Sequence, residues 1–258
     1  IAVSGGKDSM TLLYILHKIF KPTKVQIVAL AIDEGIQGYR DPQFLFVKEF
    51  CQKNNIELYT YSFKKEMGKT LDQIKQKDQE TIPCTYCGVF RRTILNKKAL
   101  ALKLDKIATG HNLDDEAQAI LMNQFRKNIR ASVTMGPVTG VVDDPKFVKR
   151  IKPLYFLTEK EIATFAFLHG LRDTFNECPN AALGYRHAIR DWINEFEQKY
   201  PGTKYNLVSS FLGTLPFLKE GYQRSQQKKT IRYCTKCGGA TSKEVCQACL
   251  LMEKIYLK

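Results

Sequence analysis

The stretch SGGKDS at residues 4–9 decides the fold. It follows an apolar segment at residues 1–3 and leads into residues 9–20, where apolar side chains recur at helical spacing. A strand, a glycine pair and a helix in this order predict a tight turn at the carboxyl end of the strand. The glycines let the backbone approach a ligand, and the helix N-terminus points N–H groups and a positive dipole at it. With a lysine and two serines, this turn is suited to bind phosphate.

The rest of the chain alternates strands and helices. The apolar run at residues 25–32 suits a strand that is buried on both faces of a parallel sheet. This order predicts an α/β fold, a doubly wound parallel sheet with helices on both faces, whose ligands bind beyond the carboxyl ends of the strands. Further strands are predicted at 56–62 and 106–109, and helices at 41–54, at 89–103, from 112, and at 158–169, where TEKE forms a capping box.

The phosphate turn does not match the Walker loop or the dinucleotide fingerprint, which need other glycine spacings. SGGKDS instead resembles the pyrophosphate (PP) loop of the ATP pyrophosphatase superfamily, whose members cleave ATP between the α and β phosphates and adenylate a substrate. The resemblance implies an adenosine contact at the end of the second strand. The implied ATP-binding residues are Ala2, Val3, Ser4, Gly5, Gly6, Lys7, Asp8, Ser9, Asp33, Gly110 and His111.

A second turn, GHNLDDEA at residues 110–117, also follows a strand and should face the same crevice. Asn112 with Asp115 three residues later makes a good helix start, so capping alone explains these residues. We prefer a second role, in which Asp115, with Asp114 as the alternative, holds Mg²⁺ on ATP or accepts a proton from the substrate. His111 is either a nucleotide contact or a packed imidazole.

Net charge favours a polyanionic partner. The 258 residues include 40 Lys and Arg against 26 Asp and Glu, a net charge of +14, which suits nucleic acid. No run of eighteen apolar residues and no secretory signal is present, so we expect a cytoplasmic protein without membrane contact. The basic residues cluster at Arg126, Lys127 and Arg130, at Lys146, Lys149, Arg150 and Lys152, and at Lys228, Lys229 and Arg232.

Eight cysteines in such a chain point to metal binding or catalysis rather than disulfides. Cys51 lies on an apolar face and is expected in the core. Two C-x2-C pairs eight residues apart have the form of a zinc ribbon, with redox thiols or a cluster as the alternatives. Such a short segment would take its folding energy from the metal. The four expected zinc ligands are Cys234, Cys237, Cys246 and Cys249.

Three further cysteines are candidates for chemistry. Cys84 and Cys87, in PCTYC, are placed just before a predicted helix that opens with Gly88, where cations and the helix dipole should depress their pKa values. Cys178, in ECP, is either a third thiol that returns to the same crevice or a buried thiol.

Together, the PP loop, PCxxC, GHNLDD, the ECP cysteine and the double CxxC resemble the TtcA/TtuA group of tRNA thiolases, especially its archaeal NcsA and TtuA branch, over essentially the whole chain. The resemblance implies a tRNA 2-thiouridine synthetase that adenylates the uracil C2 oxygen, transfers sulfur through a [4Fe-4S] cluster, and releases AMP and pyrophosphate. The implied cluster ligands are Cys84, Cys87 and Cys178, which with Asp115 and Lys7 form the expected catalytic set.

The same resemblance implies partners and domains. We expect tRNA, a sulfur donor that is either a ubiquitin-like thiocarboxylate protein or sulfide, and a homodimer. Residues 1–200 form the expected catalytic domain, 201–230 a linker or helical segment, and 231–258 the ribbon, with a further zinc finger before Ile1. Some relatives carry a catalytic lysine where this chain has Arg91, which stays protonated and so stabilises anions rather than moving protons.

Other readings remain open. The wobble uridine is favoured over the T-loop uridine, and a persulfide relay without a cluster is an alternative route for the sulfur. A binding module for nucleic acid or a sulfur carrier would retain ATP without releasing pyrophosphate. An amidating or lysidine-type ATP pyrophosphatase would not need the three cysteines at 84, 87 and 178.

Overall fold

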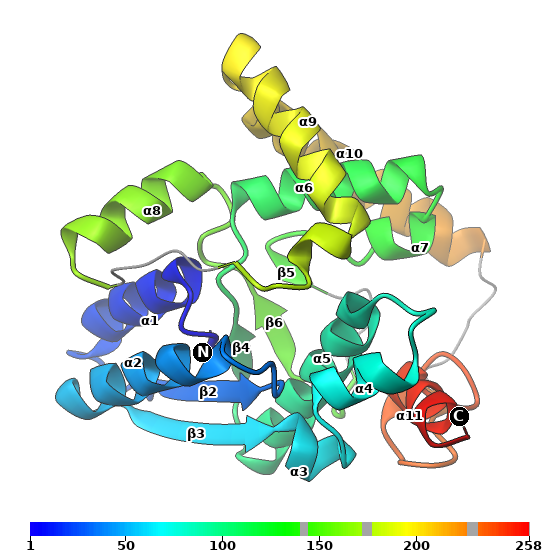
Figure 1. The fold of residues 1–258 in the computed structure, drawn as a ribbon. Helices are drawn as coiled ribbons and strands as arrows, with labels where there is room; N and C mark the ends of the chain where they lie inside the picture. Colours follow the sequence, from blue (N-terminus) through cyan, green and yellow to red (C-terminus); the bar gives the residue numbers. More distant parts are fainter. Residues whose placement is uncertain (140–143, 172–176, 226–231, 258) are drawn as a thin grey trace.

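A computed structural model describes residues 1–139, 144–171, 177–225 and 232–257 (Figure 1). Its first three strands form a parallel sheet in the order β1-β2-β3. A second sheet has the order β4-β6-β5, in which β4 and β6 are parallel and β5 is antiparallel. The predicted parallel sheet is confirmed, and β5 is an addition that the sequence does not indicate. The strands are β1 (Ala2–Val3), β2 (Val28–Asp33), β3 (Glu57–Ser62), β4 (Lys106–Ala108), β5 (Val138–Thr139) and β6 (Lys149–Ile151).

Strand β2 separates two hydrophobic cores. Leu30 and Ile32 pack in one core, and Ala29 and Ala31 pack in the other, because alternate side chains of a strand point to opposite faces. Helices therefore cover both faces, which confirms the doubly wound arrangement, and Cys51 lies in the second core as expected. The first core includes α3 (Phe63–Met67), α4 (Leu71–Lys77) and α5 (Pro83–Ala101), and the second includes α1 (Lys7–Phe20), α2 (Arg40–Lys53) and α8 (Glu159–Leu168).

A layer of helices lies beyond the second sheet (Figure 1). It contains α6 (Leu113–Phe125), α7 (Ile129–Ser132), α9 (Tyr185–Lys199) and α10 (Thr203–Ser225). Val208, Phe211 and Leu215 of α10 pack against apolar residues of α6. The stretch predicted as a linker or helical segment is, at residues 203–225, a helix that packs on α6. Lys228 and Lys229 lie outside the described residues.

Helix α5 begins at Pro83, six residues before the predicted start. Proline is well suited to the first position of a helix, since its fixed φ is helical and its missing N–H has no partner there. Cys84 therefore lies in the first turn and Cys87 at the start of the second, rather than before the helix. At a spacing of three residues, their side chains project from the same face of the helix.

The chain ends in a small cysteine-rich unit. Strands β7 (Arg232–Tyr233) and β8 (Ala240–Thr241) pair antiparallel and lead into α11 (Gln247–Leu257). Helix α11 packs on the first core through Ala248, Leu251 and Ile255. An ion pair of 2.8 Å between Lys254 Nζ and Asp78 Oδ2 also holds it against the main domain.

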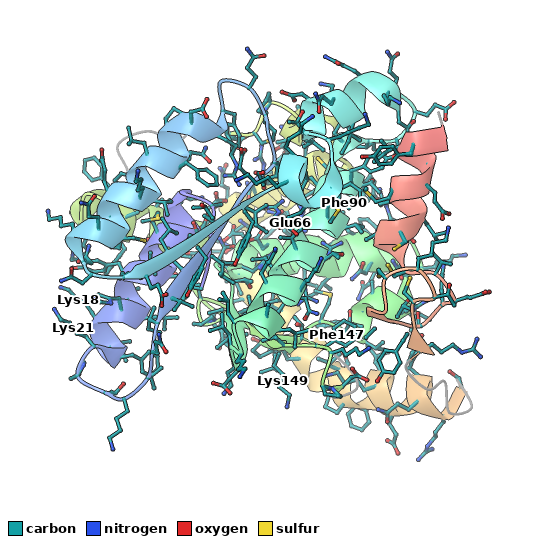
Figure 2. The ribbon with its side chains drawn as sticks, turned by 90° about the horizontal axis from the view of Figure 1, so that it is seen from below. Lys18, Lys21, Glu66, Phe90, Phe147 and Lys149 are labelled. Atoms are coloured by element: carbon teal, nitrogen blue, oxygen red, sulfur yellow. The ribbon has the colours of Figure 1, made fainter. Side chains whose placement is uncertain are left out.

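Positive charge is spread over separate parts of the surface. Lys18 and Lys21 lie at the carboxyl end of α1, whereas Lys149 lies on β6 and is well apart from them in Figure 2. Over the described ranges, no helix combines the length and the apolar character needed to cross a membrane.

Candidate active site

The SGGKDS loop is closed by its own serines. Ser4 N–H donates to Ser9 Oγ at 3.1 Å, and Ser9 Oγ donates to the Gly6 carbonyl at 3.0 Å. Gly5 has a φ of +76°, and a Cβ there would lie 2.8 Å from the Gln43 carbonyl oxygen, so a side chain would not fit. The loop lines a cavity of about 620 Å³ at the N-terminus of α1.

The second predicted turn lies directly against this loop. Gly110 packs on the backbone of Asp8, where a Cβ would approach the Asp8 carbonyl carbon to 2.9 Å. Asn112 Nδ2 donates to Asp8 Oδ1 at 3.0 Å, and Asn112 also forms the predicted capping box with Asp115. Residues 4–9 and 110–115 therefore form one crevice, as two turns at the carboxyl ends of parallel strands should.

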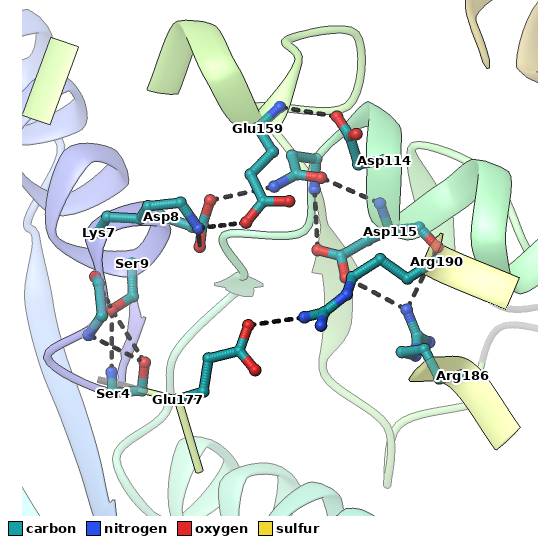
Figure 3. Close-up of polar contacts among 12 residues, drawn as sticks. Ser4, Lys7, Asp8, Ser9, Asp114, Asp115, Glu159, Glu177, Arg186 and Arg190 are labelled. Carbon is teal, nitrogen blue, oxygen red and sulfur yellow. Dashed lines mark hydrogen bonds and ion pairs between the residues drawn. The ribbon is translucent and has the colours of Figure 1, made fainter. Parts of the chain in front are cut away.

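Lys7 is held by two carboxylates in this crevice (Figure 3). Its Nζ lies 3.2 Å from Asp8 Oδ2 and 2.7 Å from Glu159 Oε1. Burial alone would lower the pKa of Lys7, but the two acids outweigh it and raise the pKa, so the ammonium is charged. Lys7 therefore presents a permanent positive charge beside the phosphate turn.

The acidic pair divides into two roles. Asp114 is buried, accepts the Glu159 N–H at 2.7 Å through Oδ2, and pairs through Oδ1 with the ammonium of Lys204. Asp115 is partly exposed and lies 3.2 Å from Arg186 Nη1 (Figure 3). Burial raises the pKa of Asp115, and Arg186 opposes that rise. Asp114 thus fixes α8 and α10 on the site. Asp115 contacts Arg186 through Oδ1 and accepts the Asn112 N–H at 3.4 Å through Oδ2, and it is the more exposed carboxylate of the pair.

Two other predicted nucleotide contacts, Asp33 and His111, lie at or just after the carboxyl ends of β2 and β4. Asp33 ends β2, and its Oδ1 accepts the Gly35 N–H at 2.7 Å. His111 Nδ1 lies 2.9 Å from Thr109 Oγ1. Desolvation and the nearby Lys152 lower the pKa of His111 well below its usual value, so the ring is neutral near pH 7. A neutral ring is compatible with a contact to a nucleotide base.

The cysteines at 84, 87 and 178 come together beside this crevice. Cys178 is close enough to raise the pKa values of both Cys84 and Cys87, although burial is the larger cause for each. The prediction of depressed pKa values is therefore wrong, because desolvation outweighs the helix dipole and Arg91. Arg91 Nη2 donates to Cys87 Sγ at 3.3 Å, and Cys84 Sγ donates to the Asn180 carbonyl at 3.5 Å.

These three thiols do not form the compact group that a single tetrahedral ion needs. In the described residues, only the four C-terminal cysteines form a group of three or more potential ligand atoms that all lie within 4.8 Å of one another. A cubane cluster spaces its three cysteine sulfurs more widely than one tetrahedral ion does. Cys84, Cys87 and Cys178 lie near enough to interact electrostatically and are outside that compact group, and three cysteine thiols are the number that a [4Fe-4S] cluster with one iron not bound by the protein would use.

The C-terminal cysteines form a compact tetrathiol site. The Sγ atoms of Cys237 and Cys246 are 3.6 Å apart, and the Cys246 N–H donates to Cys234 Sγ at 3.2 Å. This backbone hydrogen bond is the main cause that lowers the pKa of Cys234 to about 6. Four converging thiols, with backbone N–H groups directed at their sulfurs, suit a tetrahedral structural ion.

Sequence reasoning missed the residues that complete the crevice from a distance. Glu159 appears in the sequence only as part of a capping box, Glu177 only as the neighbour of the ECP cysteine, and Arg186 and Lys204 belong to no recognised motif. Tertiary packing brings all four to the crevice. A cation two residues after a helix-capping glycine, as in GYR at residues 184–186, is too common a pattern to have identified Arg186.

A family model described as a PP-loop domain matches residues 1–196. The chain belongs to the PP-loop family. Within the family it groups with NcsA- and TtuA-like tRNA thiolases, so the predicted membership is confirmed.

Among its relatives, the tRNA 2-thiolation protein NcsA of Haloferax volcanii is 36% identical over 99% of this chain and 81% of that protein. The tRNA-5-methyluridine(54) 2-sulfurtransferase of Pyrococcus horikoshii is 35% identical over 96% of this chain and 76% of its own length. The structure of the U34-tRNA thiolase NcsA from Methanococcus maripaludis, with its [4Fe-4S] cluster, matches at 33% identity and a TM-score of 0.82. The match covers 98% of this chain and 79% of the Methanococcus maripaludis chain.

Proposed function

We propose that this protein is an ATP-dependent tRNA 2-thiouridine synthetase, a sulfurtransferase that adenylates a uridine of tRNA and then replaces its C2 oxygen with sulfur. One observation carries the proposal. Glu177 lines the cavity of the PP loop, and the next residue is Cys178, the thiol that faces Cys84 and Cys87. A substrate activated at the nucleotide would therefore already lie beside the three thiols.

The first half of the reaction uses the two turns of the crevice. The uracil C2 oxygen attacks the α phosphorus of ATP, and the bond to pyrophosphate breaks. The N–H groups at the start of α1 and the ammonium of Lys7 stabilise the negative charge that develops on the phosphates. Asp115 either accepts the proton that uracil loses or holds Mg²⁺ on the nucleotide, since its side chain is the more exposed carboxylate of the acidic pair.

In the second half, a sulfur nucleophile adds to C2, and AMP leaves with the former C2 oxygen. Cys84, Cys87 and Cys178 would hold a [4Fe-4S] cluster, which supplies an iron site where the sulfur can bind. Arg91 contacts Cys87, and its guanidinium cannot deprotonate at working pH. It therefore stabilises the anionic sulfur site and does not move the proton.

The finer assignments belong to the same proposal. Wobble uridine is the target that we favour. The T-loop uridine is kept as the alternative, because relatives of both kinds resemble this chain to a similar degree. We assign zinc to the C-terminal tetrathiol site, Mg²⁺ to ATP, and a homodimer to the assembly. The sulfur donor is a ubiquitin-like thiocarboxylate protein or sulfide.

The test compares two cysteine variants after anaerobic reconstitution. Cys178→Ala removes a proposed cluster ligand, whereas Cys51→Ala is the matched control, since Cys51 is a core thiol away from the site. Mass spectrometry of nucleosides and RNase fragments of tRNA measures 2-thiouridine and its position. We expect Cys178→Ala to lose iron and thiolation while the control keeps both. Full thiolation by Cys178→Ala would contradict the proposal.

A further inference from the structure

A buried carboxylate lies between the nucleotide loop and the cysteine site. Glu34 follows β2, and its side chain is 3% exposed. Its Oε2 pairs with Arg40 Nε, and its Oε1 lies 3.7 Å from Arg91 Nε. A buried carboxylate is stable only when it is paired, and here one anion serves two guanidinium groups from different helices.

The Arg40 contact leads to the PP loop. Arg40 is buried, and its Nη1 donates to the Ser4 carbonyl at 2.7 Å and to Gln43 Oε1 at 2.8 Å. Its Nη2 donates to the Ile32 carbonyl at 2.9 Å. Arg40 therefore ties the first residue of the phosphate turn to the end of β2, and Glu34 sets the direction of its guanidinium.

The Arg91 contact leads to the cysteine site. Arg91 lies one helical turn after Cys87 on α5, and its Nη2 donates to Cys87 Sγ at 3.3 Å. The side chain of Arg91 is 44% exposed, so few other groups hold it in this orientation. Among the ion pairs of the described residues, the acid that pairs with Arg91 is Glu34.

We infer that Glu34 is a positioning residue shared by the two halves of the active site: through Arg40 it holds the PP loop, and through Arg91 it holds the donor on the Cys87 sulfur. A continuous series of contacts connects Ser4 to Cys87. It runs through Arg40, then Glu34, then Arg91. Glu34 is the member of this series that contacts both arginines, so its loss disturbs both ends, whereas the loss of one arginine disturbs its own end. The sulfur half of this inference rests on the proposed function.

The test measures each half separately. ATP affinity is measured on iron-free protein by equilibrium dialysis, and the sulfur site is measured as the rate at which a chelator removes iron from reconstituted protein. Glu34→Gln should weaken ATP binding by about tenfold, the size expected when the charge-assisted hydrogen bond to Arg40 is lost. It should speed iron loss by about threefold, because the 3.7 Å ion pair with the half-exposed Arg91 is screened by water. Arg91→Gln should speed iron loss and leave ATP affinity within twofold of the wild type, because Arg91 lies on one side only.

A matched control separates positioning from general destabilisation. Glu66→Gln breaks the 2.6 Å ion pair of Glu66 with Lys98 elsewhere in the first core and should change neither quantity. Urea unfolding of every variant is measured alongside. If Glu34→Gln does not fold, Glu34→Asp keeps the charge on a shorter side chain; it should lose the longer Arg91 contact first and so speed iron loss with ATP affinity retained.

Two outcomes would overturn the inference. Glu34→Gln with both quantities unchanged would show that neither arginine depends on it, and the proposed function would stand. Alternatively, the changes in ATP affinity and iron loss could be no larger than the lost unfolding free energy of Glu34→Gln explains. If Glu66→Gln also showed the same changes when equally destabilised, Glu34 would have only a structural role. Failure of the wild type to take up iron would contradict the proposed function instead, and the ATP measurement on iron-free protein would still decide the loop half.

Discussion

Glu159 holds the ammonium that the phosphates of ATP need, so its replacement should strengthen ATP binding. The Lys7 Nζ to Glu159 Oε1 distance is 2.7 Å, and Glu159 also lines the nucleotide cavity with its negative charge. ATP must therefore separate an existing ion pair and approach a carboxylate. The perturbation is Glu159→Gln, which keeps the size of the side chain and removes its charge.

The size of the effect follows from the exposure of the pair. The side chain of Glu159 is 43% exposed and that of Lys7 is 16% exposed, so water screens the pair and its net worth is about 1 kcal/mol. An equilibrium constant changes about fivefold for that free energy, and less at high salt. The fold should not suffer, because Asp114 is bound by the backbone N–H of residue 159 and not by its side chain.

Equilibrium dialysis of ATP with Mg²⁺ measures the effect, with Glu161→Gln as control. Glu161 lies two residues further along the same helix turn and contacts Thr158, and glutamine also serves in a capping box. We expect about fivefold tighter ATP binding for Glu159→Gln and no change for the control. Weaker binding by Glu159→Gln would refute the reasoning and would assign the carboxylate to the cation on ATP.

Three further predictions concern other contacts. Arg186→Gln removes the cation that opposes the raised pKa of Asp115, so the acidic limb of the pH–rate profile should move to higher pH; an unmoved limb would mean that Asp115 does not titrate in catalysis. Asp78→Asn should lower the free energy of unfolding by about 2 kcal/mol. The Lys254 ammonium lowers the pKa of Asp78, so the wild-type advantage should be present above the unfolded-state value of 3.8 and disappear below it in urea titrations at each pH. Cys246→Ser should release the zinc that we assign to this site and lower the hydrogen-exchange protection of the α11 amides. Unchanged protection would mean that the ribbon folds without the metal.

Local sequence signals account for much of the fold. The PP loop, the capping boxes at Asn112 and Thr158, and the apolar run of β2 act over a few residues, and the structure contains each of them. The start of α5 was misplaced because Pro83 reads as a helix breaker unless it is recognised at the first helical position.

The polar contacts that complete the site depend on tertiary packing. Lys7 and Glu159 are 152 residues apart, and Lys204 and Asp114 are 90 residues apart. No periodicity or short motif links positions at such separations. The raised pKa values at Cys84 and Cys87 have the same origin, since burial by distant segments outweighed the local dipole that the sequence shows.

The most direct test of the account is single-turnover thiolation with and without the cluster. Protein purified without oxygen is divided into iron-loaded and iron-free samples, and each is given tRNA, ATP and sulfide. Mass spectrometry then counts 2-thiouridine against AMP. The account predicts one AMP for each thiolated uridine in the loaded sample and no thiouridine in the iron-free sample. Thiolation at the full rate without iron would contradict the central claim that the cysteines at 84, 87 and 178 work through a cluster beside the nucleotide.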